Sequence, residues 1–143
     1  MNFRLLTIGV AIALAAMGCS SDGDDAGEVV EQYVEAYNSG DIDAVMAVFT
    51  DNSVVYGHPF SPESAGLTAI RSVQIDDLAA GAATDAYSIS NVEVNGDTVT
   101  WDHVWVSSSG DEICQEGQTA VIEDGKILTW TWPSADSTCP TNG

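Results

Sequence analysis

The chain contains two histidines, His58 and His103, and each lies in a setting that suggests chemistry. His58 precedes Pro59, and His103 is the central residue of the run from Trp101 to Trp105. Because the unperturbed pKa of histidine is about 6.5, His58 can act as a general base at neutral pH. A histidine before a proline is equally typical of a loop. A metal site made by both histidines is a weaker alternative, because no further ligands have the spacing of a metal site.

The run Trp101-Asp102-His103-Val104-Trp105 predicts a strand with two chemically different faces. Successive side chains of a strand alternate, so Asp102 and Val104 share one face. The other face carries Trp101, His103 and Trp105. A shift of one residue in register exchanges the inner and outer faces. If the aromatic face is external, it favours a homodimer through the outer face of the sheet, because exposed aromatic patches mark association.

Residues 1–18 are predicted to form a secretory signal peptide. Arg4 is the only charge before an apolar run from Leu5 to Met17, and small residues follow the run. A basic start, a short apolar core and small residues at the cleavage site are typical of such a signal. The run is too short for a transmembrane helix, which needs about 20 apolar residues.

Cys19 directly follows the predicted signal, and residues 19–27 are predicted to form a lipidated cysteine and a flexible polar tether. The pattern resembles a bacterial lipobox, in which the cysteine carries diacylglycerol, although Ala16 stands where leucine is usual. The resemblance implies a lipoprotein of the cell envelope, anchored by lipid on Cys19, with its domain outside the cytoplasm. The alternative is an ordinary signal peptide that is cleaved nearby.

The three cysteines of the chain support this interpretation. If Cys19 carries lipid, Cys114 and Cys139 remain as an even pair in an oxidising compartment, which predicts a disulfide bond. The bond would close a loop of about 26 residues and stabilise the fold by about 3 kcal/mol through the entropy of loop closure.

The composition excludes one class of partner. The chain has 22 acidic and 3 basic residues, for a formal net charge of −19. Such a surface repels phosphate backbones, so no nucleic-acid partner is expected. We interpret the acidity as a contribution to solubility. No cofactor or metal is expected.

The hydrophobic pattern predicts one α+β domain, residues 28–143, with helices first and an antiparallel meander after them. Asp25 and Glu28 have capping-box spacing before the first helix, and Asp41 is a candidate N-cap for the second. Apolar residues of the second helix continue to Phe49. The other expected elements are a short strand over 53–57 that is stopped by prolines, a third helix over 66–80, and strands over 86–94, 98–106, 113–122 and 126–132.

This order resembles the nuclear transport factor 2-like superfamily, in its SnoaL-like and ketosteroid-isomerase-like branch. The motifs are Tyr33-Val34-Glu35-Ala36-Tyr37-Asn38-Ser39-Gly40-Asp41, Phe49-Thr50-Asp51-Asn52-Ser53-Val54-Val55, Gly66 through Ile70-Arg71, and Asp124-Gly125-Lys126-Ile127. The resemblance implies a cone-shaped fold, with three N-terminal helices packed in the concave face of a curved, mostly antiparallel sheet. The open end of the cone would hold an apolar pocket.

Matched to the isomerase residue by residue, Tyr33 falls at the position of its hydrogen-bonding tyrosine. His58 falls at the position of the base, and Gln118 at that of the carboxylic acid donor. The same alignment turns Asp102 toward the pocket, where it would orient His58. The resemblance thus implies Tyr33, His58, Gln118 and Asp102 as catalytic candidates. The expected pocket lining is Tyr33, Tyr37, Tyr56, His58, Asp102, Gln118 and Trp130.

Two functions remain open at this point. Because His58 and Gln118 replace carboxyl groups, the resemblance favours a noncatalytic lipoprotein that binds a small, mostly apolar ligand in the cone. The alternative is an isomerase, cyclase or hydrolase, with His58 as general base and Tyr33 and Gln118 as oxyanion donors.

Overall fold

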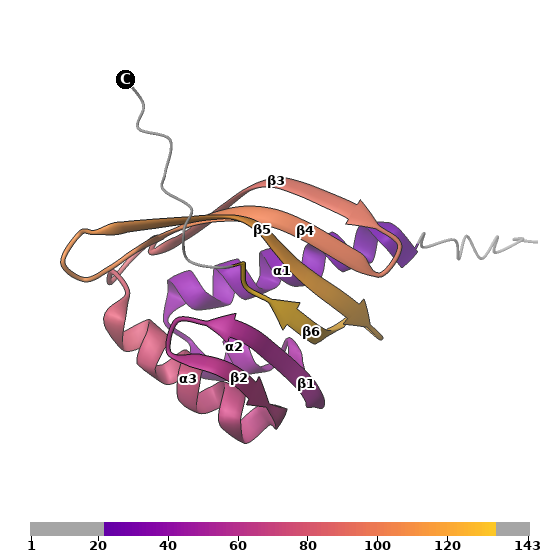
Figure 1. The fold of residues 1–143 in the computed structure, drawn as a ribbon, viewed down its shortest axis with the longest axis horizontal. Helices are drawn as coiled ribbons and strands as arrows, with labels where there is room; N and C mark the ends of the chain where they lie inside the picture. The colour runs from indigo at the N-terminus through magenta and orange to yellow at the C-terminus, as the bar shows by residue number, and fades with distance from the viewer. Residues whose placement is uncertain (1–21, 134–143) are drawn as a thin grey trace, which may run out of the picture.

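The computed structural model describes residues 22–133, with side chains from residue 26 onward (Figure 1). The predicted signal peptide, Cys19 and Cys139 lie outside the described residues. The elements are α1 (Asp22–Ser39), α2 (Ile42–Met46), β1 (Phe49–His58), β2 (Ser61–Ala65), α3 (Gly66–Ala80), β3 (Tyr87–Asn95), β4 (Thr98–Val106), β5 (Glu112–Glu123) and β6 (Lys126–Thr131).

The helices form where the apolar periodicity predicts them, with differences at their ends. Helix α1 begins at Asp22, earlier than the start predicted near Asp25. Asp41 is the N-cap of α2, and its side chain accepts hydrogen bonds from the backbone N–H groups of Asp43 and Ala44 at 3.0 and 3.1 Å. Helix α2 ends at Met46 instead of continuing to Phe49, which is the first residue of β1.

The strand after α2 is longer than predicted, and β2 was not predicted at all. Pro59 and Pro62 were expected to end the strand. Strand β1 does end at His58, directly before Pro59, which lies in the turn between β1 and β2, whereas Pro62 lies within β2. Strand β2 is at the edge of the sheet, where proline is tolerated because one side of the strand needs no backbone donor. The expectation was wrong for Pro62 alone, because a proline excludes a central strand and not an edge strand.

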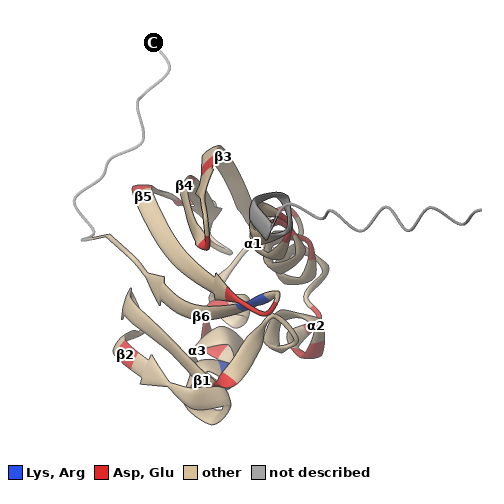
Figure 2. Ribbon diagram, turned by 90° about the vertical axis from the view of Figure 1, so that its right-hand side faces the viewer, with Lys and Arg blue, Asp and Glu red and all other residues tan. Residues whose placement is uncertain are grey.

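The sheet has six strands in the order β2-β1-β6-β5-β4-β3. All neighbours are antiparallel except β1 and β6, which run parallel and join the first hairpin to the meander. Register shifts interrupt every pairing except β1 with β2, and such bulges bend a sheet. Figure 2 shows the strands as an arc with α1 on its inner side. The predicted α+β cone is confirmed.

The core lies between the helices and the concave face of the sheet. Helix α1 packs against β3 and β4, while α3 packs against β1 and β2. Aromatic side chains fill most of the space, and these are Tyr33, Tyr37, Phe49, Tyr87, Trp101, Trp105, Trp130 and Trp132. Among the described residues, no helix has the length and apolar character needed to span a membrane.

Acidic residues are distributed over helices, strands and turns (Figure 2). Within residues 22–133 the cations are Arg71 and Lys126. Arg71 forms an ion pair with Asp43 at 2.7 Å that links α3 to α2, and the Lys126 ammonium donates to the carbonyl of Ala47. Both cations therefore hold structural contacts on the surface.

Candidate functional site

His58 points into the protein because Gly57 changes the alternation of β1. Ser53 and Val55 face the core, so strict alternation would turn residue 57 inward and residue 58 outward. Gly57 has φ of +72°, a conformation that favours glycine, and His58 is 3% exposed. A Cβ atom on residue 57 would lie 2.7 Å from the carbonyl oxygen of Trp132. Glycine is therefore required here by both backbone conformation and space.

The hydrogen bond to Nδ1 determines the tautomer of His58. The backbone N–H of Phe60 donates to His58 Nδ1 at 3.2 Å, so Nδ1 carries no proton and the neutral ring carries its proton on Nε2. Nε2 lies 3.7 Å from Oδ2 of Asp77, which is too long for a hydrogen bond. His58 Nε2 and Asp77 Oδ2 are both buried without a hydrogen-bond partner. The geometry thus presents one donor and one acceptor side by side.

Asp77 and Gln74 lie one turn apart on the buried face of α3, at 4% and 0% exposure. The Tyr33 hydroxyl donates to Gln74 Oε1 at 2.8 Å. The Tyr37 hydroxyl donates to the backbone carbonyl of Asp77 at 3.0 Å and accepts from Trp105 Nε1 at 2.7 Å. Two tyrosines of α1 therefore fix the position of this part of α3.

The ionisation of the buried tyrosines is strongly disfavoured. Burial, and after it the negative charge of Asp77, raises the pKa of Tyr33 well above its usual value. Burial also raises the pKa of Tyr37 and Tyr87, and Asp77 adds to both shifts. These tyrosines remain neutral hydrogen-bonding groups at any physiological pH.

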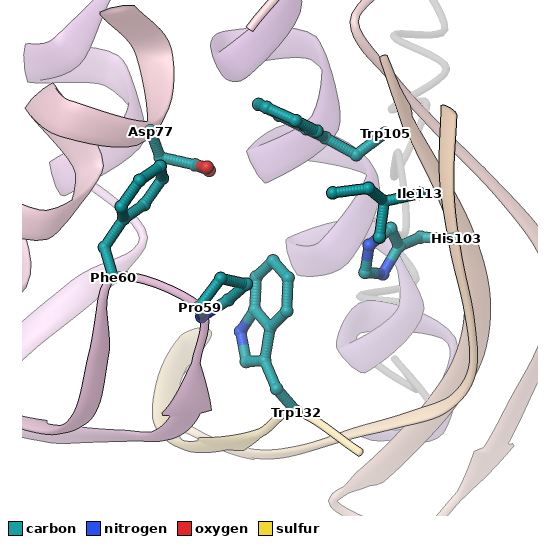
Figure 3. A pocket seen from close by; sticks show the side chains of 7 residues that line it. All are labelled: Pro59, Phe60, Asp77, His103, Trp105, Ile113 and Trp132. Carbon is teal, nitrogen blue, oxygen red and sulfur yellow. The ribbon is translucent and has the colours of Figure 1, made fainter. Parts of the chain in front are cut away.

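A cavity of about 50 Å³ lies beside Asp77. Its lining is mostly apolar and consists of Pro59, Phe60, Asp77, His103, Trp105, Ile113 and Trp132 (Figure 3). Figure 3 shows Phe60 and Asp77 on one side, with Trp105, Ile113 and His103 opposite them and Pro59 and Trp132 between. Phe60 and Ile113 are 49% and 41% exposed, so they form the outer edge of the cavity.

His103 forms part of the cavity wall. Its ring stacks on Tyr87 at 4.8 Å and contacts the edge of Trp132 at 5.0 Å, between ring centroids. Both ring nitrogens are buried and without a hydrogen-bond partner. Burial, and after it the nearby His58, lowers the pKa of His103 to about 4, while Asp102 acts in the opposite direction. His103 is therefore a neutral aromatic ring at pH 7.

The sequence-based expectation for Asp102 was wrong in its placement. Trp101, His103 and Trp105 face the core, and Asp102 lies on the opposite face of β4. Its carboxylate accepts from the Gly117 N–H at 2.8 Å and from Asn91 Nδ2 at 2.7 Å. Asn91 and Gly117 both have positive φ, at the register shifts of β3 and β5. Asp102 thus joins two bulges and does not orient His58.

The inward direction of the aromatic face also removes the reason for the expected homodimer. That expectation required Trp101, His103 and Trp105 on the outer face of the sheet, and all three are buried. A homodimer through the outer face of the sheet stays a prediction, but the aromatic patch that suggested it is not on that face.

Tyr33 and Gln118 are both buried, but the structure does not bring them together as two donors to one ligand. Gln118 Oε1 accepts from Trp130 Nε1 at 2.7 Å, and Gln118 Nε2 donates to Gln115 at 3.0 Å. The Trp130 ring packs against Tyr33 at 4.7 Å and so separates the two polar groups. The hydrogen bonds of Tyr33 and Gln118 are directed to protein partners.

The remaining residues of the expected pocket have different positions. Tyr37 and Trp130 belong to the core and do not line the cavity. Tyr56 was also expected in the pocket, but it is 39% exposed because it lies one residue out of phase with Val55 on β1. Of the expected catalytic residues, only His58 lies next to an unpartnered group at the cavity.

Asp77 is the functional candidate that sequence reasoning missed. Asp77 lies on the buried face of α3 together with Ile70 and Gln74, with helical spacing. A carboxylate on the buried stripe of an amphipathic helix is an unusual position, since buried carboxylates are rarely left unpaired. A carboxylate at that position of the helix was the feature of the sequence that could have identified Asp77 as a functional candidate.

Comparison with known families decides the relationship. The family of SnoaL-like domains matches residues 30–130, which is most of the chain. This chain belongs to the SnoaL-like domain family. The match begins in α1 and ends in β6, so it includes both His58 and Asp77. Comparison with curated protein sequences gives no match.

Solved structures with the same fold include proteins of several kinds. A protein from Kribbella flavida proposed to be a ketosteroid isomerase has a TM-score of 0.66 at 12% identity, covering 83% of this chain and 85% of its own. A protein from Sinorhizobium meliloti proposed to be a polyketide cyclase has a TM-score of 0.60 at 22% identity, covering 74% of this chain and 94% of its own. An LEH-like epoxide hydrolase from M. tuberculosis has a TM-score of 0.62 at 16% identity, covering 78% of this chain and 79% of its own. At these identities the likeness shows the fold alone.

Within residues 22–133, no group of three or more His, Cys, Asp or Glu side chains is arranged to hold a metal ion. Among the residues that line the cavity, Asp77, His103 and Trp132 carry buried polar atoms without a hydrogen-bond partner, and His58 lies beside Asp77. What the site offers chemically is one carboxylate with the Nε2–H of His58 beside it, in an aromatic enclosure that also carries the imidazole of His103 and the indole N–H of Trp132.

Proposed function

We propose that the SnoaL-like domain binds a small, mostly apolar molecule that carries one polar group, in the cavity beside Asp77. The observation that carries this proposal is that Asp77, which lines a mostly apolar cavity, has its Oδ2 atom buried without a hydrogen-bond partner, 3.7 Å from the equally unpartnered Nε2 of the adjacent His58. A buried polar group without a partner costs about 1–3 kcal/mol. A ligand that pairs with both atoms recovers this free energy, while the aromatic wall supplies apolar contact.

The size of the cavity limits what it admits as it stands. Its volume of about 50 Å³ is small beside the roughly 300–1,000 Å³ that is usual for ligand pockets. One water molecule occupies about 30 Å³ in the liquid, so the cavity holds a water or the polar end of a ligand. A larger ligand requires Phe60 to move, and Phe60 is half exposed in the two-residue turn between β1 and β2.

Calorimetric titration with small cyclic molecules tests the proposal. We expect binding to the wild-type protein and weaker binding to Asp77→Asn. The matched control is Asp76→Asn, because Asp76 is the neighbouring residue of α3 but is exposed. Phe60→Ala should strengthen binding by widening the mouth. Identical affinities in Asp77→Asn and Asp76→Asn would show that the ligand binds elsewhere.

Proton transfer by Asp77 is a second candidate function. The specific observation in its favour is that a carboxylate lines the cavity, while the Phe60 N–H occupies the basic nitrogen of His58. Asp77 would therefore be the base and His58 a donor, whereas the sequence suggested His58 as the base. The proteins of the same fold that are named as an isomerase, a cyclase and an epoxide hydrolase support this class of reaction.

Turnover assays on small epoxides and ketones, with product analysis by mass spectrometry, test the second candidate. A general base contributes about 10²–10⁴-fold to the rate, so Asp77→Asn should lose that factor and Asp76→Asn should not. A protein that binds the ligand but turns over none of these compounds would leave binding as the function.

We also propose that a lipid on Cys19 holds the domain at a membrane of the cell envelope. The support is the sequence alone, since small residues lead into Cys19 and a polar segment follows it. In a bacterial host, the wild-type protein should fractionate with membranes, and Cys19→Ala should appear as a soluble or unprocessed form. Ser137→Ala is the control and should stay with the membranes. Mass spectrometry that finds an unmodified N-terminus at another position would contradict the proposal.

A further inference from the structure

The site beside Asp77 has a defined hydrogen-bonding polarity. Asp77 Oδ2 is an acceptor, because a carboxylate offers only lone pairs. His58 Nε2 is a donor, because the Phe60 N–H to Nδ1 hydrogen bond places the ring proton on Nε2. Both side chains are more than nine-tenths buried, and neither of these two atoms has a hydrogen-bond partner, although they lie 3.7 Å from each other. A ligand must therefore satisfy one acceptor and one donor.

The distance between the two atoms is suited to a single oxygen atom. An O–H···O or N–H···O hydrogen bond has a length of about 2.8 Å. Because Asp77 Oδ2 and His58 Nε2 are 3.7 Å apart, one oxygen atom can lie at that length from both at once. Such an oxygen must donate a proton to Asp77 and accept one from His58. A hydroxyl group does both.

Other polar groups fit this pair less well. A ketone oxygen accepts from His58 but has no proton for Asp77, and its lone pairs face the carboxylate. An ammonium group donates to Asp77 but meets the N–H of His58. A carboxylate or phosphate is repelled by Asp77, in a chain with a net charge of −19. These mismatches leave neutral alcohols as the class that satisfies both atoms.

The walls determine the remainder of the ligand. Trp105, Trp132 and the neutral ring of His103 present aromatic surface, and the rest of the apolar lining consists of Phe60, Pro59 and Ile113. Aromatic side chains contribute large apolar contact areas. A compact hydrocarbon ring has matching surface and only its hydroxyl needs a polar partner.

We propose that the ligand of this site is a neutral alcohol on a compact apolar skeleton, with its hydroxyl bridging Asp77 and His58. This inference rests on the ligand-binding function proposed above and specifies its ligand class. In the bound state the hydroxyl donates to Asp77 Oδ2 and accepts from His58 Nε2.

Matched compounds test the inference. Cyclohexanol, cyclohexanone and methylcyclohexane share a six-membered ring and differ in the polar group. Their dissociation constants are measured by calorimetry on the full-length protein at pH 7. A hydrogen bond to a charged group contributes about 1.5–3 kcal/mol, so cyclohexanol should bind about tenfold or more tightly than the other two. Equal or tighter binding of cyclohexanone would overturn the alcohol class while leaving the binding function intact. No binding of any compound, including to Phe60→Ala, would overturn both.

A substitution at Asp77 gives an independent check. In Asp77→Asn the amide N–H₂ group is a donor, so cyclohexanone gains a partner and the preference for cyclohexanol should shrink or reverse. Asp76→Asn should keep the wild-type preference, because Asp76 is exposed. Circular dichroism confirms that each variant is folded before titration. An unchanged preference in folded Asp77→Asn would overturn the bridging geometry.

Discussion

The Tyr33 hydroxyl donates a 2.8 Å hydrogen bond to Oε1 of Gln74, and both residues are at most 1% exposed. This contact joins the middle of α1 to the buried face of α3, one turn before Asp77. The amide nitrogen of Gln74 has no partner, so the Tyr33 hydroxyl is the hydrogen-bonding group that orients the amide. Tyr33 therefore acts on the site through α3 and not as a donor to the ligand.

We predict that Tyr33→Phe lowers the free energy of unfolding by about 1–3 kcal/mol, because it leaves the Gln74 carbonyl buried without its donor. Tyr56→Phe is the matched control, since the Tyr56 side chain is exposed and should lose almost nothing. Chemical denaturation of both variants measures the difference. A loss in Tyr33→Phe no greater than in Tyr56→Phe would show that the contact is not formed in solution.

The conformation of Gly57 makes a second prediction. Gly57 and Gly96 have similar φ angles, +72° and +61°, but only at Gly57 would a Cβ atom meet the backbone, 2.7 Å from the Trp132 carbonyl oxygen. Gly96→Ala should therefore lose about 1–2 kcal/mol from the backbone conformation alone. Gly57→Ala should lose more, and it should also weaken ligand binding by moving His58. Thermal and chemical unfolding of the two variants compare them directly, and equal losses would contradict the structural role given to Trp132.

The sequence predicts the fold better than the site for physical reasons. Helix α3 and strand β4 have the bounds that hydrophobic periodicity indicates, because each buries one continuous face. The orientation of β4 could not be predicted, because a shift of one residue exchanges its faces and either face has groups that can be buried. The aromatic face supplies more apolar surface, and it is the face that is buried.

The partner of His58 was beyond sequence reasoning for a different reason. Asp77 is distant from His58 in the chain and approaches it only because α3 packs against β1. The resemblance suggested Asp102 as the partner of His58. The Asp102 carboxylate instead accepts hydrogen bonds from the bulges in the two strands that flank β4, from the Asn91 side chain in β3 and from the Gly117 N–H in β5. Pairing of this kind depends on tertiary contacts that periodicity does not contain.

We predict a disulfide bond between Cys114 and Cys139. Cys114 is buried on β5, while Cys139 lies outside the described residues. Loss of the bond in Cys139→Ser should cost about 3 kcal/mol, because the loop of about 26 residues gains freedom in the unfolded state. Peptide mapping without reduction detects the bond, and Ser137→Ala controls for substitution in the same segment. Two reduced thiols in protein purified from an oxidising compartment would refute the bond.

The pKa of His103 predicts how stability depends on pH. Burial, and then the neighbouring His58, lowers the pKa of His103 to about 4 in the folded state, against 6.5 as the ordinary value. Between these values the unfolded chain binds a proton that the folded protein does not, so this residue makes stability fall as the pH decreases from 6.5 to about 4. Above 6.5 its contribution is complete, and below about 4 no more is lost. The full loss is about 3 kcal/mol.

Denaturation of the wild-type protein and of His103→Phe at a series of pH values tests this dependence. Phenylalanine preserves an aromatic ring beside Tyr87 and Trp132 but does not titrate. Because carboxylates contribute equally to both proteins, the difference between the two curves isolates His103. The wild-type protein should lose stability relative to the variant as the pH falls toward 4. An NMR titration of the imidazole protons in the wild-type protein gives an independent result if His103→Phe does not fold. A His103 midpoint near 6.5 would mean that the ring reaches solvent, and the cavity wall would then be open.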